Sequence, residues 1–324
     1  MNCFINNIEL MLQIGSEEFQ EQLDRAWEKA QKKDHQMYAG NCGYADESLL
    51  SRGIGIAYYN SPKKKKIKLV VCCPSLVIDE DSSDELWVTP KNLSRLADKL
   101  DKLVVKYFHS DYGLDDFDLN RIDLSMDMDV GSRERVTDYI KVLHNIGHVK
   151  CFSPVKHDKD TGVMKDNCFG LVGNSNSIIF VVHELKHENK VLRAEVRLMS
   201  NSVIHNYIGE ISASEQLEVI GEKGGDIFMD VFGYIVPRGD FYKKPKAEKL
   251  IREKVPDWKL RSRMLRLLAL IPEKKSLHLA IKAMGCRNIK EVLAAFAEIN
   301  VSPVTISKRH DIKMLPSFYS FISE

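Results

Sequence analysis

The sequence predicts an α+β protein, in which an antiparallel-sheet domain over residues 1–240 precedes a small all-helical basic domain over residues 241–324. Up to Val236, several segments alternate apolar and polar residues at the period of two that is typical of strands. From Lys244 onward the period changes to 3.6. The charge balance also changes there, because the segment from Lys243 to Glu324 contains 18 Lys or Arg residues and 8 Asp or Glu residues.

The composition is that of a soluble globular protein, with 44% hydrophobic and 29% charged residues and a formal net charge of +1. No apolar run approaches the roughly 18 residues that a membrane span requires. The N-terminus, MNCFINNIELML, lacks the basic region and cleavage site of a secretory signal. The 7 cysteines form no CxxC pair, which argues against a disulfide framework or a cysteine zinc site. We therefore expect a cytoplasmic protein with no membrane partner.

The first segments predict a strand, a helix and a hairpin. Residues 1–12 alternate as a strand, and the polar segment 16–33 has a helical period. Gly53–Asn60 and Ile67–Pro74 are expected to pair as a hairpin. Its turn holds four lysines that are candidate phosphate contacts or simply solvated side chains, namely Lys63, Lys64, Lys65 and Lys66.

The next segments complete the expected sheet. An amphipathic helix is expected over Pro90–Phe108, opened by Thr89 and Pro90. A second helix is expected over 132–146. Strands are expected at 121–127, 149–153, 168–172, 177–182 and 191–199.

The remaining segments have mainly helical periods. Residues 200–222 are expected to be a helix that Gly224 and Gly225 end, so that Phe228–Val236 closes the sheet or leads out of it. Four short helices follow at 247–254, 258–270, 276–284 and 289–299, separated by Pro or Gly. Helix–turn–helix DNA-binding domains have this pattern, as do unrelated bundles. The basic excess favours nucleic acid, with Arg261, Arg263 and Arg266 as candidate phosphate contacts.

Two of the expected strands carry acids and arginines on one face. These polar residues are Arg121, Asp123, Ser125 and Asp127 in the first strand, and Arg193, Glu195 and Arg197 in the second. Such faces can form a site for a metal ion and a phosphate. A solvated sheet face with ion pairs is the alternative.

A short match to the zinc-binding pattern HExxH occurs at residues 183–187, HELKH. On a helix, its two histidines would lie on one face and bind zinc, with the glutamate as general base. The preceding residues, IIFVV, are typical of a strand, and the strand at 191–199 begins close after His187. This context leaves little room for a helix, and it favours a strand end with exposed histidines over a zinc metallopeptidase.

An ordered set of segments resembles the replication initiation proteins of rolling-circle plasmids and phages of low-GC Gram-positive bacteria. The segments are LNRIDLSMDMD, GLVGNSNSIIFVVHEL, KVLRAEVRLMSNSV, PRGDFYKKPKAEKLI and INVSPVTISKRHDIKMLP. The resemblance extends over residues 50–318. These proteins are similar to the replication-transfer initiators and to the filamentous-phage replication proteins.

The resemblance implies a nicking domain of the HUH-endonuclease type, built on a five-stranded antiparallel sheet and acting on origin DNA, single- or double-stranded. In such enzymes a tyrosine attacks a phosphate beside a divalent metal and leaves a free 3′-hydroxyl. The acids that match as metal ligands are Asp123, Asp127 and Glu195. Their oxygens suit Mg²⁺ or Mn²⁺. The arginines that would orient phosphate are Arg121, Arg193 and Arg197. A host helicase is a further partner that the resemblance implies.

The chain departs from this family at the nucleophile. Counted from Ser175-Asn176-Ser177, the position of the tyrosine is occupied by His183, and Glu184 follows it. Three interpretations remain open. The protein has lost nicking and kept DNA binding, another tyrosine such as Tyr207 has taken over, or His183 itself is nucleophile, general base or metal ligand. A zinc peptidase and a non-catalytic DNA-binding regulator are the alternatives of another class.

Overall fold

The computed structural model describes residues 3–13, 21, 37–38, 41–44, 47–61, 64–77, 86–108, 112–155, 168–185, 188, 190–285 and 288–322. The predicted α+β class is confirmed, with a large antiparallel sheet and several helices. The chain forms two compact units. The N-terminal unit comprises Asn2–Ser125 and Arg197–Ile227, and the C-terminal unit comprises Met126–Val196 and Phe228–Glu324 together with Met1. The expected domain boundary at residue 240 stays a prediction.

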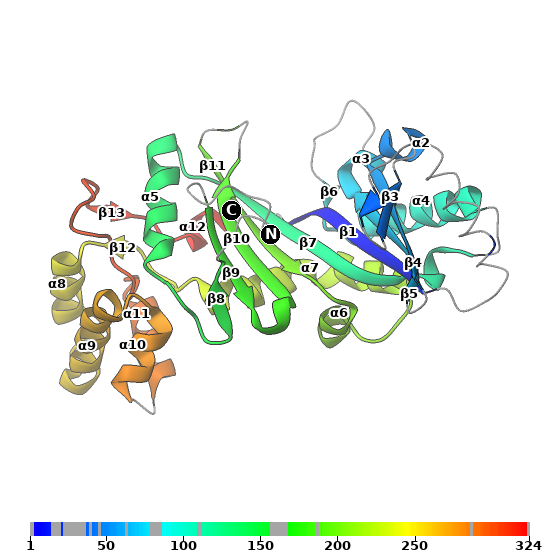
Figure 1. Cartoon of the computed structure of the whole chain (residues 1–324). Coiled ribbons are helices and arrows are strands. Elements are labelled where there is room, and N and C mark those ends of the chain that lie inside the picture. Colours follow the sequence, from blue (N-terminus) through cyan, green and yellow to red (C-terminus); the bar gives the residue numbers. More distant parts are fainter. Residues whose placement is uncertain are drawn as a thin grey trace. The chain divides into compact units, whose positions relative to one another are not determined.

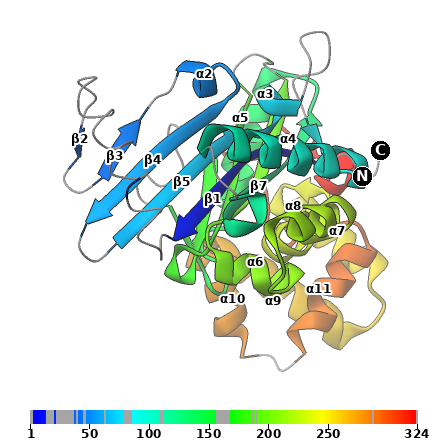
Figure 2. The same ribbon diagram turned by 90° about the vertical axis from the view of Figure 1, so that its right-hand side faces the viewer.

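The N-terminal unit is built on antiparallel strands in the order β2-β3-β4-β5-β1-β7, with β6 paired to β1. Figure 2 shows β4, β5 and β1 side by side. The strands are β1 (Phe4–Gln13), β2 (Met37–Tyr38), β3 (Asn41–Tyr44), β4 (Ile54–Ser61), β5 (Lys64–Cys72), β6 (Leu86–Trp87) and β7 (Asp118–Asp129). The helices are α2 (Glu47–Leu50), α3 (Cys73–Val77), α4 (Pro90–Phe108), η1 (Leu114–Asp116), α6 (Asn201–Ile208) and the first part of α7 (Ala213–Ile235).

One face of this sheet forms the core of the N-terminal unit. Its fully buried side chains alternate along each strand, as the period-two pattern predicts, and include Ile8, Leu10, Leu69, Ile122 and Leu124. Helix α7 covers this face near β7, because a Cβ added to Gly224 would lie 3.5 Å from Leu124. The opposite face carries the polar side chains.

The C-terminal unit contains the end of β7 and the strands that follow it in the order β7-β11-β10-β9-β8 (Figure 1). These strands are β8 (Phe152–Pro154), β9 (Cys168–Gly173), β10 (Ile178–Glu184) and β11 (Val191–Leu198). The connecting elements are α5 (Arg133–His144) and η4 (Asn174–Asn176). Ser132 is the N-cap of α5, because its side chain accepts a hydrogen bond from the Arg135 backbone N–H.

Four helices of the C-terminal unit match the helices expected after Lys244. They are α8 (Lys244–Lys254), α9 (Trp258–Lys274), α10 (Leu277–Met284) and α11 (Ile289–Glu298). Figure 1 shows these helices grouped together. The side chain of Asp257 caps α9, and the hydroxyl of Ser276 caps α10. The N-terminal caps and the 3.6-residue period of the sequence therefore account for these helices.

The C-terminal end of the chain contributes to the same unit through an aromatic core. The short strands β12 (Phe241–Tyr242) and β13 (Met314–Leu315) pair, and α12 (Tyr319–Ile322) follows. Phe232 of α7 lies with its ring centroid 5.6–6.3 Å from those of Phe228, Phe180 and Phe318. Residues close to the end of the chain thus pack against a helix and a strand far earlier in sequence.

Two local expectations were wrong. Gly224 and Gly225 do not end a helix, because α7 continues to Ile235 and makes Phe228–Val236 largely helical. Close packing explains Gly224, since a Cβ there would lie 2.8 Å from Val88 Cγ1, and it also explains Gly221 one turn earlier, where a Cβ would lie 2.8 Å from Pro90 Cα. At the hairpin, Lys64–Lys66 belong to β5, while Lys63 lies outside the described residues. The segments expected at 16–33 also lie outside the described residues, apart from residue 21.

Replacing Gly221 by alanine should lower the free energy of unfolding by about 1–3 kcal/mol, because the new methyl group would meet backbone atoms of Thr89 and Pro90 that cannot rotate away. Gly233→Ala in the same helix is the matched control, since its Cβ would meet only the Tyr319 hydroxyl at 3.4 Å. The control should be neutral or gain up to about 1 kcal/mol. Urea denaturation measures both variants, and equal effects would refute the close approach.

Among the described residues, no helix combines the length and apolar character that crossing a bilayer requires.

Candidate functional site

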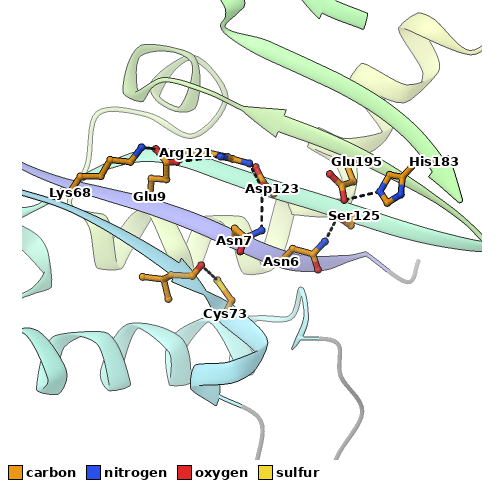
Figure 3. Close-up of polar contacts among 11 residues, drawn as sticks. Asn6, Asn7, Glu9, Lys68, Cys73, Arg121, Asp123, Ser125, His183 and Glu195 are labelled. Atoms are coloured by element: carbon orange, nitrogen blue, oxygen red, sulfur yellow. Dashed lines mark hydrogen bonds and ion pairs between the residues drawn. The ribbon is translucent and has the colours of Figure 1, made fainter. Parts of the chain in front are cut away.

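A row of alternating charges crosses three strands on the polar face of the N-terminal unit (Figure 3). Lys68 of β5 places its Nζ 2.6 Å from Glu9 Oε2 of β1. Arg121 of β7 donates to Glu9 Oε1 at 3.2 Å, and the two residues are directly opposite in the strand register. The same guanidinium donates twice to Asp123, at 2.8 and 2.7 Å. We call Lys68, Glu9, Arg121 and Asp123 the charge ladder.

The charge ladder is largely removed from water. Asp123 is 1% exposed and Glu9 is 7% exposed. Burial acts to lower the pKa of Arg121, but its hydrogen bonds and attraction to Asp123 and Glu9 outweigh this effect and raise that pKa. Burial, helped by the neighbouring Cys72 and Asp123, raises the pKa of the Cys73 thiol well above its usual range. Arg121 therefore stays positive between two buried carboxylates, and Cys73 stays a thiol.

Sequence reasoning missed half of this ladder. Glu9 and Lys68 were not predicted, nor was Asn7, whose Nδ2 lies 3.5 Å from Asp123 Oδ2. Asn6 donates to the Ser125 hydroxyl at 2.9 Å. The available signal is Glu9 itself, which is the one acid in the strand FINNIELMLQ. A buried acid requires a cation, but its identity depends on which strands are neighbours.

The C-terminal unit pairs the other predicted acids and arginines. Arg193 of β11 donates to both carboxylate oxygens of Asp127 of β7, at 2.7 and 2.6 Å. Nearer the end of β7, Lys190 lies 2.6 Å from Asp129 at an exposed position. Asp127 and Arg193 therefore form a two-point ion pair.

His183 of β10 contacts Glu195 of the neighbouring strand β11 (Figure 3). Its Nε2 lies 3.2 Å from Glu195 Oε1, and its Nδ1 lies 3.0 Å from the backbone oxygen of Glu184. Each ring nitrogen of His183 is therefore already in contact with an oxygen acceptor.

The surroundings of His183 differ from those of a zinc peptidase. Both His183 and Glu184 lie within strand β10, whereas HExxH requires a helix to bring its histidines together. Glu184 is 3.4 Å from Arg133 at the start of α5. His187 lies outside the described residues. The described half of the motif therefore has strand geometry, as the preceding IIFVV run predicts.

The predicted metal ligands do not form a metal centre in the described part of the chain. No group of three or more His, Cys, Asp or Glu side chains there is placed to hold a metal ion. Asp123 is bound by Arg121, Asp127 by Arg193 and Glu195 by His183. Their oxygens suit Mg²⁺ or Mn²⁺ chemically, but each carboxylate already contacts a basic side chain. Binding of Mg²⁺, Mn²⁺ or zinc therefore stays a prediction.

The remaining predicted site residues have separate locations. Arg121, Asp123 and Arg197 belong to the N-terminal unit, as does Tyr207 of α6, whereas Asp127, His183, Arg193 and Glu195 belong to the C-terminal unit. Lys66 Nζ contacts the Met11 sulfur at 3.5 Å. In α9, Arg261 donates to the Val255 backbone oxygen at 3.0 Å, Arg263 lies 3.5 Å from Glu291, and Arg266 is exposed. Arg261 thus has a structural partner, while Arg263 and Arg266 face solvent.

No family model, curated protein or solved structure matches the chain in comparisons of sequence and fold.

Proposed function

We propose that this chain is a DNA-binding protein of the replication-initiator type, carried by a plasmid or phage, which binds DNA through its basic helices. The observation that carries the proposal is the excess of ten positive charges from Lys243 to Glu324. Many of these cations are exposed on α8, α9 and α10, among them Lys249, Lys259, Arg266 and Lys282. Exposed Lys and Arg side chains on short capped helices can neutralise phosphates in the way that DNA-binding modules do.

The polar contacts of His183 favour binding without nicking through this residue. In the resembled family a tyrosine would stand at this position and attack the phosphate. Here both ring nitrogens are engaged, and Glu195, which would bind the metal, is instead the partner of the histidine. We propose that His183 joins β10 to β11, as Arg193 joins β11 to β7, and that the HUH-type domain serves to position DNA. A contact with a host helicase remains part of the same proposal.

The test uses supercoiled DNA that carries the region upstream of the chain's own coding sequence, incubated with the full chain and Mn²⁺ or Mg²⁺. We expect a retarded complex whose affinity falls by about 10³-fold or more between 50 and 200 mM salt, as several phosphate contacts require. We expect no open-circle product and no covalent protein–DNA adduct. His183→Ala should leave the affinity for DNA within about twofold, because His183 lies outside the basic helices.

Two results would contradict the proposal in different ways. A covalent adduct would restore the nicking interpretation, and the adducted peptide would identify the nucleophile as His183, Tyr207 or another residue. An affinity that does not change with salt would remove the argument from the basic helices. Tightly held stoichiometric zinc in the purified chain would instead favour the peptidase alternative.

A further inference from the structure

One exposed surface of α9 combines a tryptophan with a row of cations. Met264, Leu267, Leu268 and Ile271 bury the opposite side of this helix in the C-terminal unit. At 3.6 residues per turn, the side chains directed away from that core include Trp258, Lys259, Ser262, Arg263 and Arg266. We call these five residues the α9 surface. Within α9 itself the one acid is Glu273, near the C-terminal end of the helix. Its Oε1 lies 2.7 Å from Lys274 Nζ.

Trp258 is exposed to an unusual degree. Its exposed fraction of 66% is the highest among the large hydrophobic side chains of the described residues. The first turn of α9 is held in place, because the Asp257 carboxylate accepts hydrogen bonds from the backbone N–H groups of Lys259 and Leu260. Lys259 Nζ lies 5.8 Å from the centre of the indole ring. The ring is thus two-thirds exposed at the capped end of a helix, with a cation beside it.

The cations of the α9 surface are available to an anionic ligand. Lys259, Arg263 and Arg266 recur at steps of four and three residues, so they form one continuous row. Arg263 has a partner in Glu291 at 3.5 Å, but their side chains are 42% and 53% exposed. Such a solvent-exposed pair contributes little and can be exchanged for a phosphate at small cost.

We propose that the α9 surface binds single-stranded DNA, with one base stacked on Trp258 and the phosphates on Lys259, Arg263 and Arg266. Aromatic rings beside cations are the combination that binds unpaired nucleotides without sequence preference. A protein partner is disfavoured, because charged residues are depleted at the core of protein interfaces and three of the five residues here are cations. The inference rests on the proposed DNA-binding function and not on nicking. It identifies where an unpaired strand is held once the origin is open.

The test measures the fluorescence of the full chain as a 20-nucleotide oligo(dT) is added. Stacking should quench part of the emission of the three tryptophans, and Trp258→Phe should lose that quenching while it still binds. In fluorescence anisotropy with labelled oligo(dT), Trp258→Ala should weaken binding about tenfold. Arg266→Ala should reduce the slope of log affinity against log salt by about 0.7. Lys102→Ala, an exposed lysine of α4, is the charge-matched control and should change neither value.

Three results would overturn this inference. In the first, inorganic polyphosphate quenches the fluorescence as much as oligo(dT) does. In the second, duplex DNA of the same length binds more tightly than oligo(dT) and causes no quenching. In the third, Trp258→Ala and Arg266→Ala both bind oligo(dT) with the affinity of the native chain. In each of these results the chain can still bind its own upstream DNA, so that only the α9 surface is rejected. Failure of the native chain to bind any DNA would reject the proposed function as well.

Discussion

Replacing Arg121 by alanine should lower the free energy of unfolding by about 3–5 kcal/mol, because two buried carboxylates would lose their shared cation. Asp123 would retain its contact with Asn7 at 3.5 Å, and Glu9 would retain its ion pair with Lys68 at 2.6 Å. Urea denaturation followed by circular dichroism measures the change, provided that the slope against urea stays the same in both proteins.

Two further variants distinguish a structural role of Arg121 in the buried charge ladder from a role in binding phosphate. Arg121→Lys keeps the positive charge but loses the two-point hydrogen bonding to Asp123, so it should recover only part of the stability. Arg121→Met combined with Asp123→Leu removes both charges and should be more stable than Arg121→Ala. A loss below about 1 kcal/mol for Arg121→Ala would mean that the ladder behaves as a solvated surface. Unchanged stability with lost DNA binding would instead support the phosphate-orienting role that the resemblance implies.

Phe232→Ala should be equally severe, with an expected loss of about 3–5 kcal/mol from the removal of a large ring in a closed core. Phe232 is fully buried, and its ring is stacked on Phe228 with an angle of 18° between the ring planes. It also contacts Phe318 and Tyr319, which lie close to the end of the chain. The variant should therefore melt about 6–20 °C lower, if each kcal/mol corresponds to about 2–4 °C.

The control for this cavity is Phe232→Leu, which keeps much of the buried volume and should cost no more than about 1.5 kcal/mol. Limited proteolysis offers a second measurement. Loss of the Phe232 ring should expose the segment around Phe318 to cleavage, since the two rings lie 6.3 Å apart between centroids. Equal melting temperatures for Phe232→Ala and the native chain would show that the end of the chain does not depend on this core.

The two proposals concern different surfaces and can fail separately. The contacts of His183 and Glu195 bear on whether the chain cuts DNA, whereas the α9 surface bears on how an unpaired strand is held. A protein that binds oligo(dT) through Trp258 and forms no adduct would fit both. If a covalent adduct forms and the variants of the α9 surface bind oligo(dT) as the native chain does, both proposals are rejected.

The sequence by itself determined the class of the fold and most of its elements. The predicted helix Pro90–Phe108 has the same bounds in the structure, and the predicted hairpin is β4 and β5. It also placed Asp127 and Arg193 on strands that prove to be in contact. These successes have one physical reason. Period, capping and turn residues act over one or two turns of chain, so the information lies within a few neighbouring residues.

Only the tertiary structure decided which acidic and basic side chains are partners. Arg121 meets Glu9 from a strand 112 residues earlier, and His183 meets Glu195 across two neighbouring strands. It also decided that α7 continues through Gly224, where a Cβ would lie 2.8 Å from Val88 Cγ1. Strand order and register bring these residues together, and neither is contained in any local period. The acids predicted as metal ligands were therefore found in the predicted strands, but with cations as partners.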